Sequence, residues 1–136
     1  MLGDKIGEES GKITGQKVLE IGEHGPKFEA TYQGSGTTLG VGTTVMITYS
    51  SVVRPDGIIY GQGQGVLMTQ DGEMATVKGE GLARPTGHGP YAASWRGNFY
   101  YQTASQKLAR LNSIIAVFEY EVDENGNVQG TIWEWK

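Results

Sequence analysis

The chain has 136 residues, a formal net charge of −4 and no cysteine. This length fits one domain with its own hydrophobic core, and the lack of cysteine excludes disulfides, thiolate metal sites and cysteine nucleophiles. Acidic and basic residues are interspersed without a basic stripe that could follow a phosphate backbone, so we expect no nucleic-acid partner.

The N-terminal segment is polar and charged, and it has no apolar stretch of the kind found in secretory signals. No apolar run elsewhere approaches the roughly 18 residues that span a bilayer. We therefore expect a flexible segment over residues 1–11, one domain over residues 12–136, a cytoplasmic location and no membrane partner.

After residue 11, segments with alternating apolar and polar residues are separated by turn residues. The alternation predicts strands over residues 12–22, 27–39, 43–54, 57–69, 73–84, 91–102, 114–122 and 127–135. One apolar and one polar face are typical of an antiparallel sheet with a solvated side, and closing such a sheet removes its edges. We therefore predict an all-β fold, a single antiparallel β-barrel of about eight strands with up-and-down connectivity.

Three tight reversals support this order of strands. They are Arg54-Pro55-Asp56-Gly57, Gln70-Asp71-Gly72 and Asn125-Gly126, which have the proline, glycine and asparagine that β-turns prefer. Residues 103–112 break the alternation. Ser105 can cap a short helical turn over residues 105–111, with Leu108 and Leu111 on its buried side.

Five glycines recur at alternate positions of two neighbouring predicted strands: Gly61, Gly63, Gly65, Gly79 and Gly81. A hairpin with Thr69 opposite Glu73 places them on one face, and the other face carries Gln62, Gln64, Lys78 and Glu80. With the glycines inside, the lumen has room for a ligand or a bulky side chain; with the glycines outside, the lumen is polar. Both orientations remain open, and glycines can also simply relieve crowding where a small barrel bends sharply.

The two histidines lie in similar contexts, because His24 and His88 each begin a His-Gly-Pro triplet. In an up-and-down barrel, the connections after the first, third, fifth and seventh strands lie at one end. This arrangement brings both histidines and Arg54 to one mouth as polar groups. Two histidines and a carboxylate can bind zinc, but HExxH and close ligand spacing are missing, so we predict no metal site and no cofactor.

Aromatic residues dominate the apolar faces of the predicted strands. An eight-stranded barrel has an interior that is either filled by side chains or able to hold one small ligand. The expected ligand contacts are Tyr49, Trp95, Phe99, Tyr101, Phe118, Gly63 and Gly79. No nucleophile elbow is present, and the one candidate for acid–base chemistry is Glu80, provided that its face of the glycine hairpin is inside.

Three segments form a further combination: the turn Arg54-Pro55-Asp56-Gly57, the strand Gly61-x-Gly63-x-Gly65 and the late stretch Leu108-Ala109-Arg110-Leu111-Asn112. Together they resemble the small bacterial barrels that are related in fold to plant allene oxide cyclase. The resemblance implies a calycin-like barrel with a cavity for an apolar small molecule, since the plant enzyme binds and cyclises an unsaturated fatty-acid epoxide in its lumen. It transfers no catalytic residue to this chain.

Three hypotheses follow for function. The first is a module that binds a small apolar or amphipathic molecule in the lumen. The second is an isomerase or cyclase that acts on a lipid-like substrate, so whether the chain is an enzyme stays open. The third is a solid barrel that works as a homo-oligomer, with Trp133 and Trp135 at the subunit contact.

Overall fold

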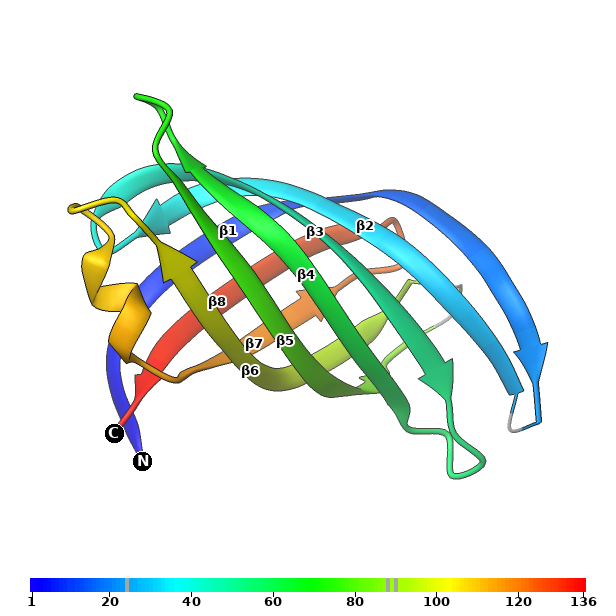
Figure 1. Cartoon of the computed structure of the whole chain (residues 1–136). Helices are drawn as coiled ribbons and strands as arrows, with labels where there is room; N and C mark the ends of the chain where they lie inside the picture. The colour runs from blue at the N-terminus through cyan, green and yellow to red at the C-terminus, as the bar shows by residue number, and fades with distance from the viewer. Residues whose placement is uncertain (24, 88, 90) are drawn as a thin grey trace.

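The computed structural model describes residues 1–23, 25–87, 89 and 91–136. Eight strands form a closed antiparallel barrel in which each strand pairs with the next and β8 pairs with β1 (Figure 1). The strands are β1 (Leu2–Gly22), β2 (Gly25–Thr38), β3 (Val41–Val53), β4 (Ile59–Thr69), β5 (Met74–Pro85), β6 (Ala93–Thr103), β7 (Ala116–Val122) and β8 (Asn127–Trp135). The predicted fold class and up-and-down connectivity are confirmed.

The first strand is the main difference from the sequence-based expectation. Residues 1–11 were expected to form a flexible segment, and this prediction is wrong, because β1 begins at Leu2. Gly7 pairs with Thr38 of β2 on one side and with Ile132 of β8 on the other. The barrel closes through this half of β1, so the segment is held by hydrogen bonds along both of its edges.

One end of the barrel is filled by the segment between β6 and β7. This segment contains the 3₁₀ helix η1 (Ala109–Ser113), which Figure 1 shows over the end of the barrel near the chain termini. Leu108 and Leu111 are 0% exposed, as expected for the buried side of the predicted helical turn. Ser105 accepts a hydrogen bond from the Leu108 amide at 3.3 Å, so it caps the turn before η1 rather than η1 itself.

The other end of the barrel carries the connections after β1, β3, β5 and β7. Arg54 and Asp123 are therefore at the same mouth, as the up-and-down order requires. His24 and His88 lie outside the described residues. In the described parts of the chain, no helix is both long and apolar enough to cross a membrane.

Candidate functional site

The glycine hairpin has its glycines inside the barrel. The register pairs Gly61 with Gly81 and Gly63 with Gly79, as the hairpin turn predicts. The opposite face is exposed to solvent and carries Gln62, Gln64, Lys78 and Glu80. One wall of the lumen is therefore bare main chain over two strands, which leaves space that side chains from other strands can fill only in part.

A cavity of about 80 Å³ lies against this glycine wall. The residues around it include the predicted contacts Tyr49, Trp95, Phe99, Phe118, Gly63 and Gly79. The cavity is also bordered by Ile13, Val122 and Val128. These residues lie where the pairing of β8 with β1 and with β7 ends, close to the mouth. The cavity thus occupies the half of the barrel that faces away from η1.

Tyr101 is the predicted contact that the structure places elsewhere. It shares the inner face of β6 with Phe99, but it does not border the cavity. Two residues further along β6 toward η1, it lies in the deeper part of the barrel. Tyr101 packs edge-on against Phe99, with ring centroids 5.8 Å apart, so it supports the cavity wall from behind.

Aromatic rings from β3 and β6, the strands on either side of the glycine hairpin, border the cavity next to the glycines. Tyr49 and Trp95 are in edge-to-face contact, with ring centroids 5.6 Å apart and an interplanar angle of 75°. A Cβ atom at Gly61 would lie 2.7 Å from Cη2 of Trp95. The indole ring therefore covers the glycine wall closely, and any side chain at position 61 would displace it.

Phe99 and Phe118 form the next layer inward, with ring centroids 4.4 Å apart. Tyr120 packs edge-on against both of these rings. Because these aromatic side chains are buried and in mutual contact, they form a preformed floor for the cavity.

Beside Tyr120 lies a carboxylate that the sequence analysis did not identify. Glu9 is on the inner face of β1, where it accepts a hydrogen bond from the Tyr120 hydroxyl. Its register partners are Gly36 of β2 and Gly130 of β8. A Cβ atom at Gly130 would lie 2.2 Å from the Tyr120 ring, so this glycine leaves the space in which Tyr120 reaches Glu9.

Burial governs the protonation of this cluster. It raises the pKa of Glu9 above the ordinary value of 4.5, and the hydrogen bond from Tyr120 opposes this effect in part. Burial also raises the pKa of Tyr120 well above 10, and the nearby Glu9 charge adds to the shift. Near the cavity, burial raises the pKa of Tyr49 to about 12. Burial therefore favours the neutral form of the Glu9 carboxyl over its charged form.

Tyr32 completes this polar layer from β2. Burial and the Glu9 charge raise the pKa of its hydroxyl. That hydroxyl is buried, yet it forms no hydrogen bond of acceptable geometry with any residue that the structure describes. Glu9 lies close enough to influence it electrostatically without being a well-aligned acceptor. One buried donor of the layer is thus left for another partner.

Glu80 and Arg54, the polar candidates that fall within the described residues, lie on the outside. Glu80 is exposed and accepts a hydrogen bond from the Tyr60 hydroxyl at 2.6 Å, so the prediction that depended on its facing inward is wrong. The Arg54 guanidinium lies 5.4 Å from the centre of the Tyr60 ring, on the outer wall near the mouth. No three metal-binding side chains gather within the described ranges.

The inner face carries little charge. Among the described strand residues that have a register partner, the charged side chains on this face are Glu9 and Glu134. Glu134 lies at the η1 end, where it pairs with Arg110 at 2.6 Å. Among the residues that the structure describes, the inner face around the cavity carries no cation that could pair with a negatively charged group, which favours uncharged molecules.

Comparisons with known proteins show the fold. No family model and no curated protein matches the chain. Among solved structures, a conserved protein of unknown function from Rhodopseudomonas palustris has a TM-score of 0.81 and 14% identity, over 98% of this chain and 97% of that one. A β-barrel-like protein from Acinetobacter baumannii has a TM-score of 0.83 and 14% identity, over 100% and 96% of the two chains.

A fungal protein has the same fold with a lower similarity. The chain covers 98% of an enzyme from Penicillium herquei, which in turn covers 98% of this chain, with a TM-score of 0.62 and 18% identity. At these identities the likeness shows the architecture alone. The structural neighbours are thus small β-barrel proteins, among which the bacterial ones have no known function.

Proposed function

We propose that this protein binds a small, uncharged and largely apolar molecule in the lumen of its barrel. The observation that supports this proposal is the cavity lined by the glycine wall and by the Tyr49–Trp95 pair. Leu108 and Leu111 fill the opposite end, so a ligand would enter through the mouth. A site with apolar walls and few polar groups is the usual form of a small-molecule pocket.

The size of the cavity limits what it can hold. Its volume of about 80 Å³ is below the roughly 300 Å³ at which ordinary ligand pockets begin. It accommodates about one ring or a short segment of chain. The rest of a larger ligand would have to extend through the mouth or require movement of the Tyr49 and Trp95 rings.

An enzymatic role on a lipid-like substrate, as an isomerase or cyclase, is the second candidate. It is favoured by the Glu9–Tyr120 pair inside the barrel and by the sequence resemblance to the allene oxide cyclase fold. However, Glu9 does not border the cavity, and a general base must come within hydrogen-bond reach of its substrate. Binding is therefore the better-supported function.

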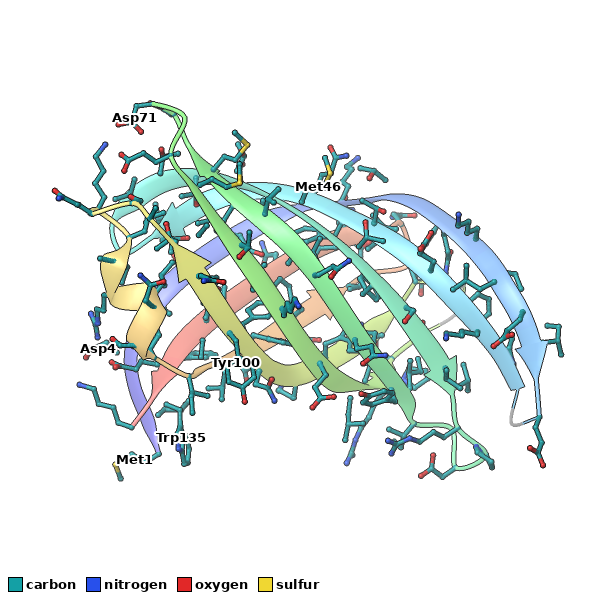
Figure 2. All side chains as sticks on the ribbon, viewed as in Figure 1. Met1, Asp4, Met46, Asp71, Tyr100 and Trp135 are labelled. Carbon is teal, nitrogen blue, oxygen red and sulfur yellow. The ribbon has the colours of Figure 1, made fainter. Side chains whose placement is uncertain are left out.

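The homo-oligomeric role has a separate basis on the outer surface. Trp135 is 53% exposed and Tyr100 is 56% exposed, and Figure 2 shows Trp135 near the chain termini, outside the barrel. Exposed aromatic residues are enriched at subunit contacts. Size-exclusion chromatography with light scattering tests this role, and a monomer at high concentration would contradict it.

Fluorescence titration with the neutral probe N-phenyl-1-naphthylamine tests ligand binding. We expect saturable binding to the wild-type protein and a weaker affinity for Trp95→Leu and Tyr49→Leu, because both variants remove a wall of the cavity. Trp135→Leu is the matched control on the outer surface and should bind as the wild type does. Circular dichroism checks that each variant is folded, and an absence of saturable wild-type binding would contradict the proposal.

A further inference from the structure

The β1–β2 hairpin extends the inner surface of the barrel beyond its mouth. In the register, β8 pairs with β1 only from Leu2 to Lys12. β2 continues to pair with β1 up to Gly22, whose register partner is Gly25 of β2. Figure 1 shows the hairpin projecting past the turn between β7 and β8. Over this last part, β1 has β2 along one edge, and its other edge has no strand partner among the described residues.

Cross-strand pairs identify the side chains on that inner face. Val18 pairs with Phe28, and Phe28 alternates with the buried Ala30 and Tyr32 along β2. Paired residues of antiparallel strands lie on the same side of a sheet, so Val18 and Phe28 continue the lumen wall. On the outer side, Lys17 and Glu29 are also register partners and form an ion pair at 3.2 Å, which agrees with this assignment.

A β-bulge brings Ile21 to the same inner face. The register shifts between Val18 and Glu20, so that Leu19 is the extra residue and Ile21 pairs with Pro26. Without this insertion, Val18 and Ile21 would lie on opposite faces, because they are three positions apart. Val18 is 59% exposed and Ile21 is 77% exposed. We call Val18, Ile21, Pro26 and Phe28 the apolar shelf.

The shelf is continuous with the cavity. Ala30, the next inner residue of β2, pairs with the cavity residue Tyr49, and Phe28 pairs with Ser51 on the same face of β3. The charged residues that have a register partner in this part of the hairpin are on the outer side, where Glu20 is the partner of Lys27. The inner surface that runs from Tyr49 out along the hairpin is therefore largely apolar, and its polar members are Gln16, the partner of Ala30, and Ser51.

We infer that the apolar shelf binds the part of the ligand that the cavity cannot hold. This inference rests on the proposed function and makes it more specific, since the ligand is then an elongated, uncharged apolar molecule. One end occupies the small cavity beside Trp95, and the other lies across Val18 and Ile21. Burial under a ligand accounts for two large apolar side chains that are otherwise left in water.

A second copy of the chain is a weaker explanation for this surface. Addition of a strand along the free edge of β1 would have to accommodate two register shifts, one between Ile13 and Gly15 and one between Val18 and Glu20. Bulges and charged residues such as Lys17 are features that discourage edge-to-edge pairing. The shelf is thus better suited to a small molecule than to another strand.

The test compares the affinity of N-phenyl-1-naphthylamine for two double variants. Val18→Ser/Ile21→Ser makes the shelf polar, and we expect the dissociation constant to rise about fivefold to tenfold, because part of the apolar contact is lost. Met74→Ser/Leu82→Ser is the matched control, since both residues are similarly large, apolar and exposed but lie on the outer face. It should leave the dissociation constant unchanged.

The outcomes separate this inference from the proposed function. If Trp95→Leu weakens binding and the shelf variant does not, the cavity binds the probe alone and the inference is overturned. If the wild-type protein does not bind the probe, both proposals are contradicted. Light scattering on the same samples tests the remaining alternative, a subunit contact at the shelf. This alternative would be supported, and the inference overturned, if the wild type were a dimer and the shelf variant a monomer with unchanged probe affinity.

Discussion

Tyr120 of β7 donates a hydrogen bond to Glu9 of β1, although the two residues are 111 positions apart in the sequence. The contact passes over β8 on the inner face of the barrel, since Gly130 of β8 is the register partner of both residues. It exists because β8, which lies between these strands, has Gly130 beside the Tyr120 ring. A buried carboxylate with one well-defined donor makes folding stability depend on pH.

Replacing Glu9 by Gln should reduce that dependence. Because burial raises the pKa of Glu9 in the folded protein, its contribution to stability is fully present below the unfolded-state pKa and is lost as pH rises through the folded-state pKa. Glutamine does not ionise. We therefore expect the melting temperature of Glu9→Gln, relative to wild type, to increase between about pH 4 and pH 7.

Circular dichroism melts at several pH values measure this effect. Each tenfold difference in acid dissociation constant between the two states is worth about 1.4 kcal/mol. Glu20→Gln, at an exposed position of the same strand, is the matched control and should show no such trend. A difference between Glu9→Gln and wild type that stays constant with pH would contradict the prediction.

The two tyrosines of the polar layer should respond differently to loss of their hydroxyl groups. Tyr120→Phe removes the donor of a buried carboxylate and should cost about 1–3 kcal/mol in the free energy of unfolding. Tyr32→Phe removes a buried hydroxyl that has no partner among the described residues, so it should be neutral or stabilising. Urea unfolding measures both, and equal losses from the two variants would show that Tyr32 also makes a stabilising hydrogen bond.

The glycine wall should not tolerate a methyl group. A Cβ atom at Gly79 would lie 2.2 Å from the carbonyl oxygen of Asn98, so the main chain must shift. We expect Gly79→Ala to cost about 1–3 kcal/mol in unfolding free energy, as overpacked cores do. At Gly42 a Cβ atom meets nothing within 4 Å, and Gly42→Ala should change stability little. Equal effects of the two substitutions would contradict the close packing of the wall.

Much of this architecture could be predicted from alternation and turns. The period of two residues located the later strands to within a few positions, and the turn at residues 70–72 gave the pairing of Gly61 with Gly81. The same alternation also identified most of the cavity wall, because aromatic residues and glycines recur at every second position of the strands that line it. The inward orientation of the glycines follows from the charged residues on the other face of the hairpin, because those charges are more stable in solvent.

The first half of β1 was missed for a physical reason. Its inner positions are Gly7, Glu9 and Gly11 rather than large apolar residues, so the usual hydrophobic alternation is missing. Their alternating glycines were the available signal, of the same kind as in the glycine hairpin. The bulge that turns Ile21 inward could not be predicted at all, since its register is set by the pairing with β2.

The plugged end of the barrel should be the most sensitive to truncation. Leu108 is completely buried, and its replacement by Ala should cost about 2–5 kcal/mol in unfolding free energy, because the space it leaves cannot close fully. Leu82→Ala is the matched control on the outer wall, where 46% of the residue is exposed, and it should cost less than about 1 kcal/mol. Urea unfolding of both variants decides the point: similar losses would mean that η1 lies loosely on the barrel, and the lumen would then be accessible from both ends.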